Sequence, residues 1–433
     1  MNNTTRNRFL IAGATAVCAL LQLACGPKAA DQTAATPPPA TFAQCELPTA
    51  QTLAKWEALA KTNPDEASWR LFVGANCATN GKLTWETWTE QTCLADPTKC
   101  PTGAAPRRTL HASRLALKSK AAAAAPGTPG GVSCGSMTTS ASTGVSSLLP
   151  FVPTNLKPGA KFCEEVFANP PEADYIRANH LETLTGQQAF TQTIDFKKES
   201  IEVKVDWVAA GTFTNVTCSP ALSSQVYTEM IDGTCYLMVG MHMSSKLLPN
   251  WLWSTFEPQY FNSNPNRCNP ALYSDCRDSW GSNPAVSTGA ATQPTDVLNA
   301  LFTQAGTQLP AGFKNYRLTG SQTDFVDKQN NPITLGNSFV EFNAQVLAGQ
   351  ASCITCHSDA QLVKTGVVPG TKPPSPENPN FGPFPAVMTS DPTTSYPGTP
   401  NSGNGGAPPT AAQGGGTWVK QDFSWLLGIL PVK

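Results

Sequence analysis

Three residues near the C-terminal end of the sequence have the types and the spacing to carry chemistry. They are Cys353, Cys356 and His357, which together form a C-x-x-C-H motif. This motif attaches a c-type haem, because its two thiols bond to the porphyrin and its histidine binds the iron. Two intervening residues let one helical turn present both sulfur atoms to the edge of the ring. The motif therefore predicts one covalent haem c, with His357 as the proximal iron ligand.

Two other uses of a C-x-x-C pair are a disulfide and one half of a zinc site. A zinc ribbon needs a second pair of ligands at similar spacing, and the sequence contains no second C-x-x-C. Only four histidines occur among the 433 residues, so a neighbouring histidine is an uncommon event in this chain. Both observations favour haem over zinc at this motif.

The first 24 residues have the composition of an export signal. Two arginines precede an apolar run over residues 9–24, which is too short for a dependable membrane span. The segment Leu21–Gly26 resembles a bacterial lipoprotein cleavage box, although Gln22 stands where an aliphatic residue is usual. We therefore expect an exported protein held at the membrane by a lipid on Cys25. A plain secretory signal is the alternative.

The cysteine count agrees with export. Of the 14 cysteines, two lie in the signal region and two in the C-x-x-C-H motif, so ten remain. An even number of scattered cysteines is typical of oxidising compartments, where disulfides persist. Haem attachment to this motif in bacteria also takes place outside the cytoplasm, so we expect the protein in the cell envelope or periplasm. Proximity along the chain suggests the pairs Cys93–Cys100, Cys218–Cys235 and Cys268–Cys276.

The charge balance argues against nucleic acid as a partner. Charged residues make up 14% of the chain, and without the signal segment 27 basic residues stand against 30 acidic ones. Binding to nucleic acid depends on a basic surface that neutralises phosphates, and this composition supplies no basic excess.

Changes in composition divide the chain into six parts. Residues 25–44 are rich in Ala, Thr and Pro, and residues 102–150 are rich in Ala, Ser, Thr, Gly and Pro. Asn63 followed by Pro64 predicts the start of a second N-terminal helix. The predicted parts are a signal peptide (1–24), a tether (25–44), an N-terminal helical part (45–101), a low-complexity linker or insertion (102–150), a β-rich body (151–313) and a C-terminal haem-binding region (314–433).

The middle of the chain has the patterns of an antiparallel sheet. Residues 201–207 alternate strictly between apolar and charged side chains, which predicts a strand. Asp232 and Gly233 lie between two apolar runs and predict a hairpin, and residues 251–256 continue the sheet. A short helix containing His180 is expected before the first strand.

Helices are expected on both sides of the haem motif. Ser338 and Glu341 have the spacing of a capping box, which predicts a helix through residues 339–347 that leads to Cys353. Asp422 opens a final apolar segment over residues 423–430, which predicts a terminal helix. The expected fold is α+β, with a mainly antiparallel β-rich body, N-terminal helices and a C-terminal cytochrome c-like haem module.

The sequence resembles a family of bacterial exported proteins of the cytochrome c class. The resemblance covers most of the chain after the tether and implies a one-haem envelope protein without implying a substrate. Relatives often have a histidine after the Thr-Phe-Glu of their W-x-W-x-T-F-E motif, whereas this chain has Pro258, so no ligand role is transferred there. The matching segments are 68–73, 85–88, 201–207, 240–243, 251–257, 316–318, 353–357 and 422–424.

The sixth iron ligand decides between electron transfer and chemistry at an open iron. Met388 follows the motif in a Pro-rich segment, as in a small electron-transfer cytochrome. His242 is the rival, because it faces away from the apolar stripe of its predicted strand. A half-buried histidine hydrogen-bonded in the sheet is the plainer interpretation of His242. His111 and His180 are expected to be surface or packing residues.

These observations favour an electron carrier or redox subunit over a stand-alone enzyme. We expect a monohaem c-type cytochrome that exchanges electrons with a redox partner protein at the cell envelope. A haem-dependent oxidoreductase with an open iron, or a haem-containing binding or sensor protein, is the alternative. A di-haem peroxidase would need a second C-x-x-C-H motif, and the sequence has none.

Overall fold

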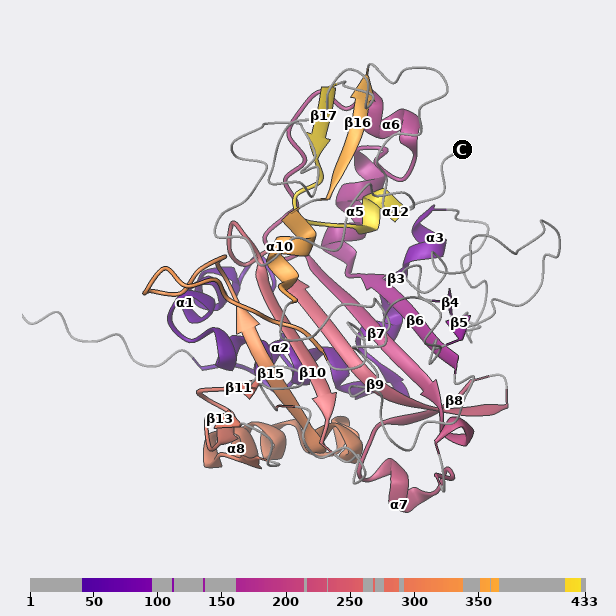
Figure 1. Ribbon diagram of the computed structural model, residues 1–433, viewed down its shortest axis with the longest axis vertical. Coiled ribbons are helices and arrows are strands. Elements are labelled where there is room, and N and C mark those ends of the chain that lie inside the picture. Colours follow the sequence, from indigo (N-terminus) through magenta and orange to yellow (C-terminus); the bar gives the residue numbers. More distant parts are fainter. Residues whose placement is uncertain are drawn as a thin grey trace, which may run out of the picture. The chain divides into compact units, whose positions relative to one another are not determined.

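The structure is a computed structural model, shown as a ribbon in Figure 1. From Phe42 onward the described residues belong to one compact unit. The structure describes residues 41–95, 111–112, 135–136, 161–213, 216–231, 233–259, 268, 276–287, 292–337, 351–358, 360–365 and 417–429.

A single large antiparallel sheet is the centre of the described part of the chain. Its main path runs β15-β10-β9-β7-β6-β3, while β4 and β5 also pair with β6 and β8 pairs with β9. Every one of these pairs is antiparallel. The strands are β3 (Thr89–Glu90), β4 (His111–Ala112), β5 (Gly135–Ser136), β6 (Lys161–Ala168), β7 (Ile201–Ala209), β8 (Thr228–Ile231), β9 (Thr234–Ser245), β10 (Leu252–Pro258) and β15 (Tyr316–Gln322).

The strands β7, β8 and β9 form where the sequence predicts them. Alternation places Val203 and Val205 of β7 in the main apolar core, while Glu202 and Lys204 point to the other face of the sheet. The predicted hairpin is confirmed, because Ile231 of β8 is paired with Thr234 of β9 across a two-residue turn. β10 confirms the strand expected at residues 251–256. β15 comes from the predicted C-terminal region and pairs with β10 in the same sheet.

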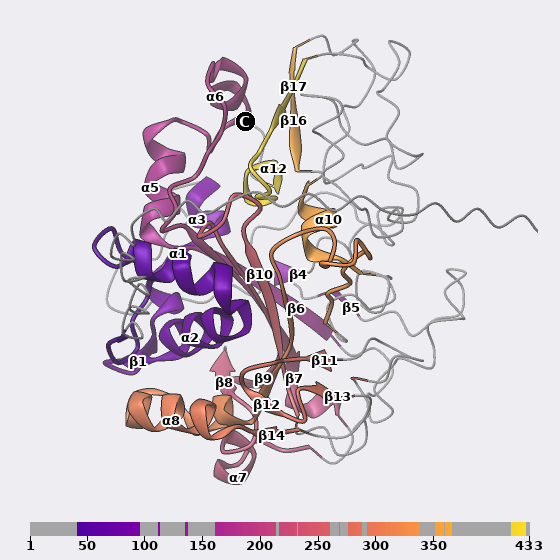
Figure 2. The ribbon, with the colours of Figure 1, turned by 90° about the vertical axis from the view of Figure 1, so that its left-hand side faces the viewer.

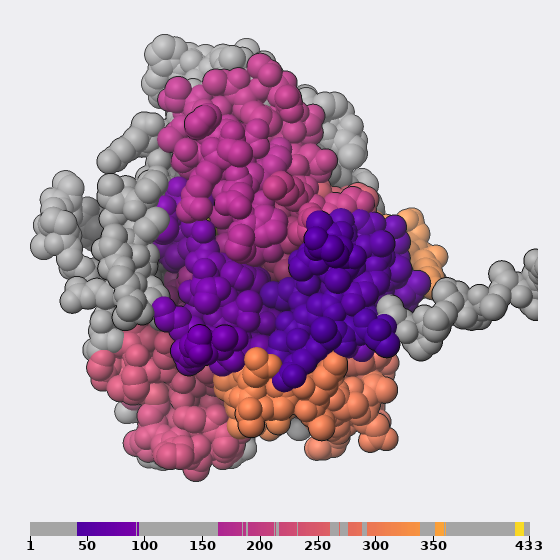
Figure 3. Space-filling model, turned by 180° about the vertical axis from the view of Figure 1, so that it is seen from behind, coloured from indigo at the N-terminus to yellow at the C-terminus, as the bar shows by residue number. Residues whose placement is uncertain are grey.

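Helices α1 (Leu53–Thr62) and α2 (Pro64–Asn76) cover one face of this sheet (Figure 2). The predicted cap is confirmed, because the Asn63 side chain accepts a hydrogen bond from the Glu66 backbone N–H at 3.3 Å. Trp69 of α2 and Phe256 of β10 have ring centroids 5.1 Å apart, with an edge-to-face geometry. Figure 3 shows this side of the molecule, where α1 and α2 (indigo) lie between segments near α5 (magenta) and α8 (orange).

The remaining described helices and short strands lie around the sheet. The helices are α3 (Gln91–Ala95), α5 (Pro170–Ala178), α6 (Leu184–Ala189), α7 (Pro220–Ser223), α8 (Asp296–Ala305), α10 (Cys353–Ser358) and α12 (Leu426–Ile429). The 3-10 turns are η1 (Trp85–Thr87), η5 (Ala210–Thr212), η6 (Gly306–Gln308) and η7 (Ala311–Asn315). Four two-stranded sheets join β1 (Ala78–Thr79) to β2 (Lys82–Leu83), β11 (Cys276–Arg277) to β13 (Val286–Ser287), β12 (Ser282–Asn283) to β14 (Gln293–Pro294), and β16 (Gln361–Thr365) to β17 (Thr417–Lys420).

A second, smaller apolar core lies on the other face of the sheet, and it brings α10 to the body of the protein. Figure 2 shows α10 across the sheet from α1 and α2. Strands β6 and β10, helices α5, α10 and α12, and the segment before α12 all contribute to this core. Its buried members are Leu94, Val166, Ala168, Ala173, Ile176, Leu181, Ile194, Phe196, Trp251, Trp253, Phe325, Leu335, Cys353, Ile354, Phe423, Leu426 and Leu427.

Two of the three predicted disulfides are confirmed. The structure contains Cys218–Cys235 and Cys268–Cys276, and it adds Cys45–Cys77 between residues 32 positions apart. Cys93 is disulfide-bonded, but Cys100 lies outside the described residues, so the third predicted pair stays a prediction.

The mixed α+β class is confirmed, but two helix predictions are wrong in detail. α5 ends at Ala178, and His180 lies beyond it with φ of 55°, so the predicted helix containing His180 does not reach that residue. The terminal helix is shorter than expected, because Asp422 and Phe423 have left-handed backbone angles and α12 begins only at Leu426. The helix predicted at residues 339–347 lies outside the described residues.

A helix long and apolar enough to cross a membrane is absent from the described residues.

Candidate functional site

The C-x-x-C-H residues form helix α10, which packs into the second apolar core. Cys353 is buried and Cys356 is half-buried, and both are thiols in this structure. By contrast, the other described cysteines are in disulfides. The Cys353 thiol lies 3.5 Å from the backbone carbonyl oxygen of Leu335, and the Trp425 indole N–H donates to the Cys356 carbonyl at 3.0 Å. One short helix therefore presents the two thiols and the imidazole of the motif together.

The imidazole of His357 is held in one orientation by two contacts. Its Nδ1 atom lies 2.8 Å from the backbone carbonyl oxygen of Phe423. A carbonyl only accepts, so Nδ1 carries the hydrogen and Nε2 keeps its lone pair. The ring also packs on Trp253 of β10, with centroids 4.3 Å apart. A metal-binding histidine commonly has this arrangement, because a hydrogen bond from the other ring nitrogen fixes its tautomer.

The His357 ring is neutral over a wide pH range. The pKa of His357 is lowered to about 4, because burial and, to a smaller extent, the positive charge of Lys204 outweigh the opposing effect of the Phe423 hydrogen bond. Metal ligation requires the neutral imidazole, because the lone pair of a protonated ring is occupied. The site therefore keeps His357 in its ligating form.

The carbonyl that orients His357 belongs to a tightly held segment, residues 422–424. Asp422 forms a buried ion pair with Lys246 and accepts a hydrogen bond from the Phe196 backbone N–H at 2.8 Å. Ser424 donates to the Glu202 carboxyl group of β7 at 2.9 Å. We name this tripeptide the C-terminal clamp, because side-chain contacts hold it on both sides of the carbonyl that binds His357.

The backbone of the C-terminal clamp is strained. Asp422 has φ of 49° and Phe423 has φ of 66°, and Trp251 nearby in the second core has φ of 62°. Left-handed backbone is a real outlier for bulky residues, and such strain clusters at functional sites. Phe423 and Trp251 belong to the same core as α10, and Asp422 precedes Phe423, so this backbone strain lies beside the C-x-x-C-H motif.

His242 lies on the sheet face that points toward α10. It is paired with Lys204 on one side and Thr255 on the other, and its apolar neighbours Met241 and Met243 point into the main core. Burial lowers the pKa of His242 well below its usual value, and the charges of Lys204 and His357 lower it further. Of the two predicted sixth ligands, the structure thus places His242 within electrostatic reach of His357. Met388 lies outside the described residues.

Aromatic rings connect His357 to the surface of the protein. Trp253 packs on Trp251 at 6.1 Å between centroids, and Trp251 packs on Phe196 at 5.9 Å. Phe196 packs on Tyr175 of α5 at 5.1 Å, and Tyr175 is half-buried. The imidazole therefore stands at one end of a continuous aromatic chain whose other end reaches solvent.

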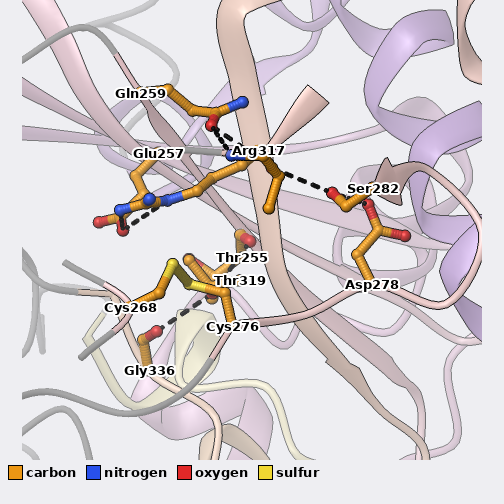
Figure 4. The surroundings of a disulfide bond; sticks show 11 residues. Thr255, Glu257, Gln259, Cys268, Cys276, Asp278, Ser282, Arg317, Thr319 and Gly336 are labelled. Carbon is orange, nitrogen blue, oxygen red and sulfur yellow. Dashed lines mark hydrogen bonds and ion pairs between the residues drawn. A yellow bond between two sulfur atoms is a disulfide. The ribbon is translucent and has the colours of Figure 1, made fainter. Parts of the chain in front are cut away.

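One other group of side chains has the spacing of a metal site. Ligand atoms of Glu257, Cys268 and Cys276 lie within 4.8 Å of one another. Figure 4 shows why this is not a metal centre. The two sulfur atoms form a disulfide, and the Glu257 carboxyl group forms an ion pair with Arg317. The Arg317 guanidinium donates to Glu257 at 2.7 and 3.2 Å, and both side chains are buried.

The other predicted site residues lie elsewhere or outside the described chain. His180 is exposed beyond α5, as expected of a surface histidine. His111 is in β4, where its backbone pairs with Glu164 of β6. Cys25 lies outside the described residues. The sequence did not predict that Trp253 packs on His357 or that the charge of Lys204 lowers its pKa. Both residues lie on strands that are far from His357 in the chain.

Comparisons with protein-family models, with curated proteins and with solved structures find no match for this chain. The predicted resemblance to exported cytochromes therefore stays a prediction, and the geometry of the site carries the functional argument alone.

Proposed function

We propose that the protein is a monohaem c-type cytochrome that transfers electrons at the bacterial cell envelope. The observation that carries this proposal is the geometry of His357, whose Nδ1 atom donates to the Phe423 carbonyl at 2.8 Å beside the two thiols of the motif. A metal-binding histidine usually donates a hydrogen bond of this kind from the ring nitrogen that does not bind the metal.

The residues present fit a covalent haem. Cys353 and Cys356 would hold the porphyrin edge through thioether bonds, and His357 would bind the iron through Nε2. The haem, when bound, supplies an iron centre that gains and loses one electron. Trp253 restrains the ring of His357, and the C-terminal clamp fixes its tautomer. Partial burial against the second core lowers the pKa of the imidazole and so favours its neutral form.

His242 is the sixth ligand that the described part of the chain supports. It is neutral, half-buried and close enough to His357 for their charges to interact. Met388 stays the rival. A second protein ligand would fill the iron's coordination sphere, and this favours electron transfer over binding of a small substrate.

The proposed location rests on the cysteines and on the N-terminal sequence. The disulfides Cys45–Cys77, Cys218–Cys235 and Cys268–Cys276 support an oxidising compartment. The predicted export signal and the predicted lipid site at Cys25 support attachment to the membrane. The partner would be a redox protein, and the aromatic chain that ends at Tyr175 offers a packed route from the site to the surface.

The test is the optical spectrum of the purified holoprotein, followed by denaturation and extraction with acidified solvent. We expect a haem c spectrum and a chromophore that stays with the polypeptide. The double variant C353A/C356A should lose the covalent chromophore, whereas the control variant H180A should keep it, because His180 is exposed and is not part of the motif. Complete extraction of the chromophore from the wild-type chain would refute the proposal.

Carbon monoxide distinguishes the proposed function from the alternative classes. A wild-type ferrous spectrum indifferent to carbon monoxide means that both axial positions are filled, and H242A should then bind carbon monoxide while H180A does not. If H242A is also indifferent, M388A is the next variant to compare. Rapid binding by the wild type would instead favour an oxidoreductase with an open iron, and binding without any turnover would favour a sensor.

A further inference from the structure

Three buried carboxyl groups gather beside the C-terminal clamp. Glu172 comes from α5, Glu202 from β7, and Asp422 from the clamp itself. The Asn169 side-chain oxygen accepts hydrogen bonds from the backbone N–H groups of both Glu172 and Ile201, which holds the start of α5 beside the start of β7. Their exposed fractions are 0%, 8% and 7%. The haem binding proposed above uses none of these side chains as a ligand, so their burial needs a separate explanation.

The three carboxyl groups differ in the ion-pair and hydrogen-bond partners that offset the cost of their burial. Asp422 is neutralised by Lys246, with Asp195 as the second partner of that ammonium at 3.1 Å. Glu202 accepts one hydrogen bond, from Ser424 at 2.9 Å. Among the described residues, neither carboxyl oxygen of Glu172 has a hydrogen-bond partner. An isolated carboxylate in such a place is costly, and the group normally takes up a proton instead.

A bound metal ion is a poorer explanation than a proton. Three ligand atoms around one ion must lie within a few ångströms of one another. Among the described residues, the group that meets this requirement is Glu257 with Cys268 and Cys276, and its sulfur atoms are in a disulfide. Glu172, Glu202 and Asp422 are therefore close enough to interact electrostatically, but they do not converge as metal ligands.

Burial also sets the pH at which this pair changes its charge. Burial raises the pKa of Glu172 well above its usual value, and the nearby carboxyl groups of Glu202 and Asp422 raise it further. Burial raises the pKa of Glu202 to about 7, although the Ser424 hydrogen bond and the charge of Lys204 oppose the shift. Both shifts favour the protonated carboxyl groups, and the pKa of Glu202 lies near neutral pH, so the coupled pair can exchange a proton there.

Two hydrogen bonds and one peptide link connect Glu202 of this pair to His357, the proposed iron ligand. Ser424 binds Glu202, and its chain neighbour Phe423 binds His357 through the carbonyl oxygen. A change of charge at the iron acts across a buried region, where electrostatic interactions are weakly screened. Loss of one positive charge at the iron makes a proton on the carboxyl pair more favourable.

We propose that Glu172 and Glu202 hold a redox-linked proton, so that the protein moves protons together with electrons. In the reductive step, a one-electron donor protein reduces ferric iron to ferrous iron, and the pair gains one proton from solvent as a new O–H bond on a carboxylate oxygen. Oxidation reverses both changes. This inference rests on the proposed function, because it requires a haem iron near His357. The charged groups that act on the pair are Asp422 and Lys204, and Asp422 is itself paired with Lys246, whose ammonium also binds Asp195.

The test measures the reduction potential of the holoprotein between pH 5 and pH 9 by optical titration. A proton taken up with each electron changes the equilibrium constant tenfold per pH unit, which is about 59 mV for one electron. We expect the wild-type potential to fall as pH rises, with a slope approaching this value near neutral pH. E202Q and E172Q should flatten the slope, whereas D174N, an exposed carboxyl group on the same helix, should leave it unchanged.

A second measurement keeps the test decisive if a variant folds poorly. The reduced-minus-oxidised infrared spectrum of the wild-type protein should gain the C=O band of a protonated carboxylic acid. A wild-type potential independent of pH, or an infrared difference spectrum without this band, would overturn the redox-linked proton. Failure of the proposed function is distinguishable, because the chromophore would then be extracted from the denatured wild-type chain.

Discussion

The buried ion pair between Glu257 and Arg317 permits a quantitative prediction for E257Q. Arg317 donates two hydrogen bonds to one oxygen of Glu257, the shorter at 2.7 Å, and the side chains are 1% and 3% exposed. The amide of glutamine keeps the shape and one acceptor, but it leaves the guanidinium charge buried without a counter-charge. Removing one partner of such a pair costs about 3–5 kcal/mol. We expect about 3 kcal/mol for E257Q, because the acceptor is retained.

The assay is equilibrium unfolding in urea, with the disulfides intact. For a slope of about 1–3 kcal/mol/M, a loss of about 3 kcal/mol lowers the midpoint by about 1–3 M. The matched control is E57Q, which breaks an ion pair of the same 2.7 Å length between Glu57 and Lys198. Lys198 is 57% exposed, so this pair is worth at most about 1 kcal/mol. Equal midpoints for E257Q and E57Q would refute the reasoning that burial sets the cost.

Two further predictions concern the imidazole of the site and the hairpin. In the apoprotein, the pKa of His357 is about 4 in the folded state and 6.5 in the unfolded state, so its contribution to stability is present above pH 6.5. We expect this contribution, about 2 kcal/mol after allowance for partial exposure, to be lost as the pH falls from 6.5 to about 4. Urea midpoints measured across this range should fall less steeply for H357Q, and parallel curves would contradict the assignment. Gly233 has φ of 75° with open space around the position of a side chain, so G233A should cost about 1–2 kcal/mol through backbone strain alone. Thermal unfolding should show a smaller loss for G233N, because asparagine tolerates the left-handed region, and an equal loss would point to a different cause.

The parts of the fold that sequence could predict are those in which local pattern and structure agree. The alternation through β7, the turn at Gly233 and the Asn63 cap depend on neighbouring residues, and each is confirmed. The pair Cys218–Cys235 is 17 positions apart and was also predicted, whereas Cys45–Cys77 joins the residue that follows α2 to the segment before α1 and was not predicted.

The environment of the site depends on contacts that no local pattern shows. The charged face of β7 is typical of a strand exposed to solvent, but the C-terminal clamp and α5 bury Glu202. Trp253 reaches His357 across more than a hundred residues of sequence. Glu172 lies in the first turn of α5, where an acidic residue is ordinary, and only the packing of that helix on β7 makes it a buried group. The residue types at the site were thus predictable, and their burial and partners were not.

The bond between His357 and Phe423 joins residues that are 66 positions apart. Because a chain is made from its N-terminus, the attachment cysteines exist well before the carbonyl that orients the imidazole. Under the proposed function, maturation would then have two separable stages, in which thioether formation comes first and docking of the C-terminal clamp then fixes the orientation of the His357 imidazole. Docking of the clamp would then be the last step in assembly of the site. A chain that ends before Phe423 should still carry a covalent haem. Its optical spectrum should differ from that of the full chain, because the His357 imidazole is then no longer held in one orientation.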